Sequence, residues 1–165
     1  MPVTEGSLLT LLIQSIELRE IRLPLVHFFE TSFGRTTERR IILARVTDAN
    51  GEGWGECTAG EGPFYSDEWT ETAWATLTEF LGPMMLRKEF ESAAHAFKVM
   101  KPVRGHRMAK ATLETACWDL EAKNARVPLW NRTIRGDLAQ LRSSQDRKNA
   151  KRGVSAVGAI TCCFW

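Results

Sequence analysis

Apolar and charged residues alternate along Ile16–Leu25, and this pattern predicts a β-strand with one apolar face. The alternation changes phase at Glu20-Ile21, where a bulge or a bend is expected. A second strand-like run, Arg39–Asp48, ends in the turn sequence ANGEG, and GWGEC (53–57) comes next as a short third strand. The three runs predict an antiparallel meander.

Beyond Asp67 the spacing of apolar residues changes from two to about 3.6, which indicates helices. The sequence predicts a helix that Asp67 caps and Gly82-Pro83 ends, a weaker helix over Glu89–Met100 and a stronger one over Arg107–Asn124. The fold class is therefore α+β: a three-stranded antiparallel meander followed by a helical bundle. We expect residues 1–13 to be an N-terminal extension, 14–130 to form the domain, and 131–165 to form an irregular tail.

Two connections stand out by their composition. His27–Glu38 is longer than a hairpin needs and carries Phe28, Phe29 and Phe33. Gly53–Glu68 combines glycines and a proline with Tyr65, the only tyrosine of the chain. Exposed aromatic residues on loops need a partner. Either they fold back onto the local core, or the loops cover a ligand.

Composition and charge exclude several classes of protein. The chain has 165 residues, 44% of them hydrophobic and 25% charged, which is ordinary for one globular domain. Its net charge of +2 gives no reason to expect nucleic acid or membrane as a partner. Residues 131–152 hold seven basic residues against Asp137 and Asp146, without interleaved aromatic residues, so nucleic-acid binding is not expected there either. No signal peptide and no membrane-spanning stretch is recognised, which favours a soluble cytoplasmic protein.

No complete catalytic constellation is visible, so no catalytic and no metal-ligating residue is predicted. The three histidines lie in different elements, and the four cysteines lack zinc-site spacing. Cys57 and Cys117 lie among apolar residues, which is typical of buried free thiols. GHRMAK (105–110) begins a helix, where Arg107 and Lys110 either hold an anion or are ordinary surface cations.

Four segments, IELREIRLPL, FFETSFGRTTER, GWGECTAGEGPFYS and GHRMAKATLETACWDLEAKNARVPLW, occur in an order that is specific. Together they resemble the N-terminal capping domain of the enolase superfamily, within its o-succinylbenzoate synthase / N-acylamino acid racemase group, from about Gln14 to Trp130. The resemblance implies that His27–Glu38 and Gly53–Glu68 are loops that close over the mouth of a barrel and contact the substrate. The substrate-binding residues that it implies are Phe29, Ser32, Gly60 and Tyr65, with Gly60 leaving space for a larger group.

The resemblance also implies a chemistry for the complete enzyme. A lysine removes a proton α to the carboxylate of a small substrate, and Mg²⁺ stabilises the enediolate. A synthase then eliminates water on the way to menaquinone, whereas a racemase or epimerase reprotonates the other face. Those groups lie on barrel strands, and a barrel takes about 200 residues, whereas 35 residues follow Trp130. We therefore expect no Mg²⁺ binding and no turnover by this chain alone.

Two further interpretations stay open. The chain is a non-catalytic binding remnant, whose exposed cap surface binds a partner or self-associates. Alternatively, residues 131–165 are a divergent basic tail, disordered or translated out of the ancestral reading frame.

Overall fold

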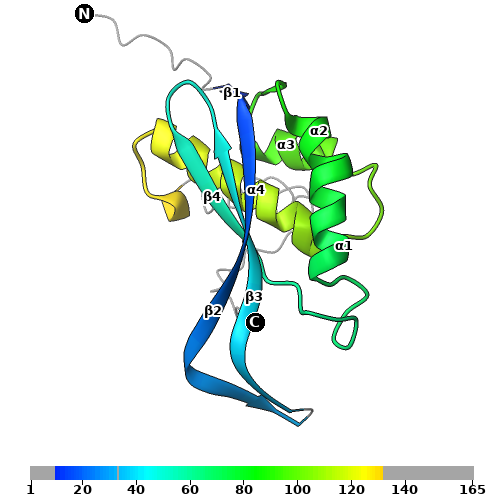
Figure 1. The fold of residues 1–165 in the computed structure, drawn as a ribbon. Helices are drawn as coiled ribbons and strands as arrows, with labels where there is room; N and C mark the ends of the chain where they lie inside the picture. Colours follow the sequence, from blue (N-terminus) through cyan, green and yellow to red (C-terminus); the bar gives the residue numbers. More distant parts are fainter. Residues whose placement is uncertain (1–9, 33, 132–165) are drawn as a thin grey trace, which may run out of the picture. The chain divides into compact units, whose positions relative to one another are not determined.

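The computed structural model describes residues 10–32 and 34–131; of the tail expected over 131–165, all but Asn131 lies outside the described residues. Three strands form one antiparallel sheet in the order β2-β3-β4 (Figure 1). The strands are β2 (Ser15–Thr31), β3 (Gly34–Thr47) and β4 (Glu52–Cys57). The predicted meander is confirmed, and so is the α+β fold class.

The first two strands are much longer than the sequence predicted. Pairing runs without interruption from Ser15 opposite Thr47 to Pro24 opposite Glu38, so the bulge expected at Glu20-Ile21 is wrong. The register instead shifts between Pro24 and Phe29, where four residues of β2 lie opposite a single residue of β3. Proline cannot donate a ladder hydrogen bond, and an edge strand such as β2 tolerates it.

Pairing resumes after this shift and continues to Thr31 opposite Gly34. The segment His27–Glu38, expected to be a loop, is therefore mostly the distal half of a two-stranded ribbon. The segment shows no alternation of apolar and polar residues, because neither face of the distal ribbon is buried against the core.

The first helical segment is continuous from Thr70 to Met85. It consists of α1 (Thr70–Ala75), a π-helical segment η1 (Thr76–Leu81) and α2 (Gly82–Met85). The expectation that Gly82-Pro83 ends the helix is wrong. Pro83 lies in the first turn of α2, where its missing N–H costs little, and the preceding π turn, with the Gly82 N–H donating to the Leu77 carbonyl, accommodates its ring.

The expected cap of this helix is also wrong. Trp69, not Asp67, is the N-cap residue, and its N–H donates to the Thr72 hydroxyl at 3.0 Å. The predicted helix over Glu89–Met100 begins only at Ala93, because the Ser92 hydroxyl accepts the His95 N–H at 3.2 Å and caps α3 (Ala93–Val99).

A short strand, β5 (Glu89–Phe90), precedes α3 and pairs with β1 (Leu11–Leu12) near the start of the chain. Leu11 and Ile13 are fully buried. Residues from the segment expected to be an N-terminal extension therefore contribute to the core.

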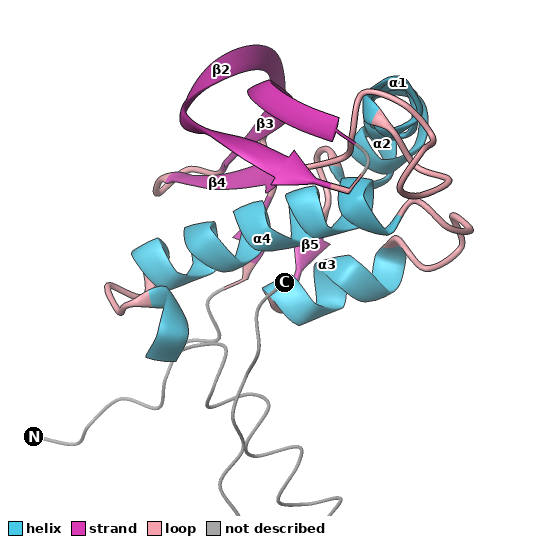
Figure 2. Cartoon of the chain, turned by 90° about the horizontal axis from the view of Figure 1, so that it is seen from below, coloured by secondary structure: helices cyan, strands magenta, loops and turns pink. Residues whose placement is uncertain are grey.

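The longest helix, α4 (Arg107–Asn124), has the bounds that the sequence predicted. It lies across one face of the sheet, and α3 packs on α4 away from that face (Figure 2). The core fills the space between these layers, and its largest fully buried side chains include Phe90, Leu11, Ile13, Ile42, Leu77, Leu81, Met85, Met100, Leu113 and Leu120.

Candidate functional site

The GWGEC segment brings β4 into direct contact with α4. A Cβ atom placed on Gly55 would lie 1.9 Å from the Thr112 carbonyl oxygen, and one on Gly53 would lie 2.0 Å from the Ala116 carbonyl oxygen. Both distances are far below van der Waals contact, so only glycine allows this approach of strand to helix. Between the two glycines, the Trp54 N–H donates to Asp119 of α4 at 2.9 Å. This part of the predicted loop Gly53–Glu68 is thus a structural contact.

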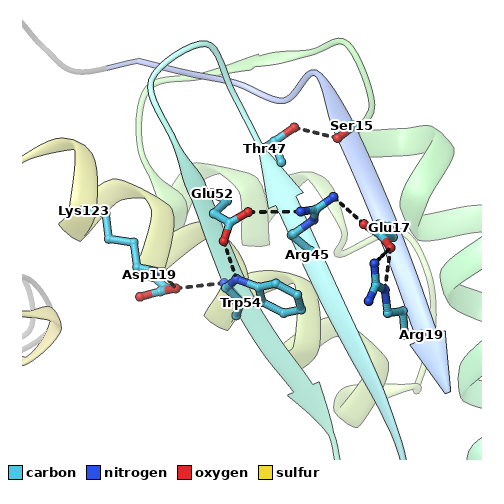
Figure 3. A network of polar contacts seen from close by, with 9 residues as sticks. All are labelled: Ser15, Glu17, Arg19, Arg45, Thr47, Glu52, Trp54, Asp119 and Lys123. Atoms are coloured by element: carbon cyan, nitrogen blue, oxygen red, sulfur yellow. Dashed lines mark hydrogen bonds and ion pairs between the residues drawn. The ribbon is translucent and has the colours of Figure 1, made fainter. Parts of the chain in front are cut away.

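The opposite face of the sheet carries a row of charges (Figure 3). Arg45 of β3 pairs with Glu17 of β2 at 2.6 Å and with Glu52 of β4 at 3.2 Å. Arg19 pairs with the same Glu17 at 2.5 Å. These side chains are about one-third to more than one-half exposed, so each ion pair contributes little to stability. The row accounts for the polar residues at Glu17, Arg19, Arg45 and Glu52.

The start of α4 holds a buried carboxylate. Glu68 is 6% exposed, and its two oxygens accept the N–H groups of Met108 and Ala109, each at 2.8 Å. A carboxylate at this place satisfies two of the unpaired N–H groups and faces the positive end of the helix dipole. A carboxylate of the chain itself thus occupies the backbone N–H groups at the start of α4. Sequence reasoning missed Glu68 because its partners are about 40 residues away.

Two segments extend beyond the N-terminal end of α1, on the same side of the domain (Figure 1). One is the tip of the β2–β3 ribbon, and the other is the connection over residues 58–69. The ribbon carries two of the four predicted substrate-binding residues, Phe29 and Ser32, and the connection carries the other two, Gly60 and Tyr65. Phe29 is 56% and Tyr65 92% exposed, so neither folds back onto the core.

Gly60 lies where the 58–69 connection joins α1. Its carbonyl oxygen accepts the Thr70 N–H at 2.9 Å and the Thr70 hydroxyl at 3.1 Å. A Cβ atom at Gly60 would be 3.7 Å from the nearest atom beyond the adjacent residues, the Gly62 carbonyl oxygen, which is ordinary contact. The space beside Gly60 is therefore free for a larger side chain or for a ligand.

The base of the ribbon is tied to α1 by ion pairs. Arg40 of β3 donates two hydrogen bonds to Glu20 of β2, at 2.7 and 2.8 Å, and one to Glu71 of α1. These hydrogen bonds hold the pKa values of Glu20 and Glu71 below their ordinary range and raise that of Arg40, most strongly through Glu20. The link joins β2, β3 and α1 at the base of the ribbon.

A second ion pair and a ring contact lie farther along the ribbon. Arg22 pairs with Glu38 across the strands at 2.8 Å, and the Arg35 guanidinium lies 3.9 Å from the centre of the Phe28 ring. Phe28 is therefore covered by a cation rather than by the core, and it stays half-exposed.

Cys57 and Cys117 are buried free thiols, as the sequence indicated, whereas Cys162 and Cys163 lie outside the described residues. Burial raises the pKa of both thiols, that of Cys117 to about 12. A thiol with so high a pKa is a poor nucleophile at neutral pH, so neither cysteine is a candidate catalytic group.

The raised pKa of Cys117 predicts a pH dependence of stability. In the unfolded chain this thiol ionises above its ordinary pKa of about 8.5, whereas in the folded chain it stays protonated until about pH 12. The free energy of unfolding should therefore fall between these values, by up to about 1.4 kcal/mol per pH unit from this group. We expect chemical denaturation of Cys117→Ala to show a less steep decline over that range than the wild type, and equal slopes would contradict the assignment.

The described residues contain no group of three or more His, Cys, Asp or Glu side chains that could hold a metal ion. They therefore do not fit the Mg²⁺ site of the complete family enzyme. In the same part of the chain, no helix is long and apolar enough to cross a lipid bilayer.

Comparison with known proteins agrees with this architecture. Residues 15–132 match the family described as mandelate racemase / muconate lactonizing enzyme, N-terminal domain. The chain is 37% identical to an N-succinylamino acid racemase of Amycolatopsis sp over 132 residues, which are 80% of this chain and 34% of that protein. It is 40% identical to the o-succinylbenzoate synthase of Geobacillus stearothermophilus over 118 residues, 71% of this chain and 32% of that protein.

Solved structures give the same result. An enolase superfamily member from Listeria innocua has a TM-score of 0.70 at 27% identity, over 74% of this chain and 33% of that one. A member from Enterococcus faecalis has a TM-score of 0.62 at 41% identity, over 68% of this chain and 31% of that one. The chain spans about one third of the length of the relatives that it matches. The chain therefore belongs to the enolase superfamily and contains its N-terminal capping domain, that of the mandelate racemase / muconate lactonizing enzyme family.

Proposed function

We propose that this domain is the substrate-capping part of an o-succinylbenzoate synthase-like lyase. Such an enzyme removes a proton α to a carboxylate and eliminates water, and we assign it to menaquinone biosynthesis in the cytoplasm. The observation that carries the proposal is the pair of projecting segments, the ribbon tip and the 58–69 connection. Both present exposed aromatic side chains, and Phe64 and Tyr65 of the connection are the most exposed aromatic residues among those the structure describes.

In this proposal the four residues of the projecting segments contact a small carboxylate substrate. Phe29 and Tyr65 supply apolar surface, the Ser32 hydroxyl supplies a hydrogen-bonding group, and Gly60 leaves room for the group of the substrate that is distal to the reacting carbon. The proton transfer itself needs a base and a Mg²⁺ site outside the described residues. No catalytic step is therefore assigned to residues 10–131.

A second function within the superfamily is N-acylamino acid racemase or epimerase. It is favoured by the match to the N-succinylamino acid racemase from Amycolatopsis sp, which covers 80% of the chain. The cap would play the same part, because both reactions begin with removal of the proton α to the carboxylate. The two reactions differ only after that step, in whether water is eliminated or the proton is returned.

A chimera tests the capping role. Residues 10–131 would replace the equivalent segment of the Geobacillus stearothermophilus synthase, and synthase and racemase activities would be measured side by side. We expect the chimera to be active and Tyr65→Ala to raise KM about tenfold, because a buried aromatic contact contributes roughly 1.5–3 kcal/mol. Phe80→Ala is the matched control, since Phe80 is exposed on η1 and not on a projecting segment. Equal KM values in the two variants would contradict the assignment of Tyr65.

We further propose that the purified chain alone turns over neither substrate class. Assays with Mg²⁺, with and without a chelator, measure this directly, and turnover that the chelator abolishes would contradict it.

A non-catalytic binding role is the remaining candidate. Phe64 is 97% and Tyr65 92% exposed, and such side chains favour association with a partner or with a second copy. Sedimentation velocity of the wild type and of the Phe64→Ser/Tyr65→Ser variant separates association with a second copy from association with a different partner. A monomer at all concentrations would exclude self-association through this surface.

A further inference from the structure

A hollow of about 420 Å³ lies between α3, the connection to α4 and the first turn of α4. Figure 2 shows this connection at the end of the two helices. The residues that line the hollow are Phe97, Lys101, Val103, Arg104, Gly105, Arg107 and Lys110. None of the four residues predicted to contact the substrate is among them, so the hollow is independent of the proposed enzymatic function.

The lining is strongly basic. Four of its seven residues are Lys or Arg, and none is acidic. Within residues 10–32 and 34–131, the ion pairs involve other cations, on the sheet, on the ribbon and near the end of α4. Four cationic side chains therefore line one concavity, and within the described residues none of them forms an ion pair.

The most buried of the four is Lys110. It is 9% exposed, and its ammonium group donates to the Val103 carbonyl oxygen. An ammonium group has three N–H donors, and a charge withdrawn from water is costly unless an opposite charge accompanies it. Glu68, the carboxylate at the start of α4, accepts the Met108 and Ala109 N–H groups, and it is not among the ion pairs of the described residues. Lys110 thus leaves unused donor capacity at the wall of the hollow.

We propose that this hollow binds the phosphate or pyrophosphate group of a small ligand. The guanidinium groups of Arg104 and Arg107 have the fork geometry that suits phosphate oxygens, and Lys101 and Lys110 add two ammonium charges. The side chains of Phe97 and Val103 form an apolar wall for an organic part of the ligand. Because Glu68 occupies the first N–H groups of α4, the anion is held by side chains and not by the helix terminus.

Titration of the full chain with inorganic pyrophosphate at constant ionic strength tests the proposal. Isothermal titration calorimetry would compare the wild type with Arg104→Gln, Arg107→Gln and Lys98→Gln. Lys98 is an exposed cation of α3 that does not line the hollow, so its variant has the same change of net charge. We expect each arginine variant to bind pyrophosphate about tenfold more weakly or worse, since a charge-assisted hydrogen bond contributes roughly 1.5–3 kcal/mol. Lys98→Gln should bind as the wild type does.

Arg104 and Arg107 are both exposed, so neither variant should unfold the chain, and circular dichroism verifies this. Three outcomes would overturn the proposal: no pyrophosphate binding by the wild type, equal affinity in all four proteins, or the same loss in Lys98→Gln as in the arginine variants. The third would show a nonspecific charge effect. A further outcome is that pyrophosphate does not bind but a single-stranded oligonucleotide does, in a way that depends on Arg104 and Arg107. The ligand of the hollow would then be nucleic acid and not a small molecule.

Discussion

Replacing Gly55 by alanine is expected to lower the free energy of unfolding by about 3 kcal/mol or more. The added Cβ would lie 1.9 Å from the Thr112 carbonyl oxygen, which is backbone and cannot rotate away. Strand β4 and helix α4 would have to separate, and the hydrogen bond from the Trp54 N–H to Asp119 would weaken with them. A loss of this size removes a large part of the stability of an ordinary domain, about 5–15 kcal/mol. Urea denaturation measures the change.

Gly60→Ala is the matched control for this experiment. It adds the same methyl group, but the nearest atom beyond the adjacent residues is 3.7 Å from the new Cβ. We expect a change within about 0.5 kcal/mol of the wild type, or a small stabilisation because alanine restricts the unfolded chain. If both variants lost the same stability, the close approach of β4 to α4 would not be the cause.

Glu68→Ala is expected to destabilise the domain by about 3 kcal/mol. The substitution removes both acceptors of the Met108 and Ala109 N–H groups, and Ala109 is fully buried, so water cannot replace the lost bonds there without opening the packing. The Glu68→Gln variant keeps one acceptor oxygen and should lose about half as much. Thermal unfolding monitored by circular dichroism measures both changes.

The neighbouring carboxylate provides the control. Asp67 is exposed, it is not the N-cap residue of α1, and Asp67→Ala should change stability by less than about 0.5 kcal/mol. A larger loss in Asp67→Ala than in Glu68→Ala would contradict the role of Glu68 and restore the cap that the sequence suggested.

The contacts of Gly55 and Glu68 give a structural reason for the motifs that carry the family resemblance. GWGEC and GHRMAK are recognisable for reasons of packing: the glycines admit α4, and the start of α4 takes the Glu68 carboxylate. The residues proposed to contact substrate lie in less constrained surroundings on the ribbon tip and the 58–69 connection.

The sequence by itself determined those features that depend on local periodicity. The alternation of Ile16–Leu25 and Arg39–Asp48 predicted two neighbouring strands, and the period of about 3.6 residues predicted α4 within the observed bounds, Arg107–Asn124. In β3 and α4 one face is buried and the other is solvated, and in β2 the side chains of Ile16 and Leu18 pack partly buried against the core. The apolar pattern can therefore be recognised in consecutive residues.

Only the tertiary structure decided the features that depend on contacts between distant residues. The distal ribbon over His27–Glu38 has no buried face, so its residue pattern is that of a loop. Its strands are defined by backbone pairing alone. The continuation of the helix through Pro83 depends on a π turn, which the residue pattern does not predict. Glu68 meets its partners across about 40 residues, and Gly55 meets the Thr112 carbonyl only because β4 and α4 pack together. Such contacts depend on how the elements pack in three dimensions. The spacing of residues along the chain does not specify that packing.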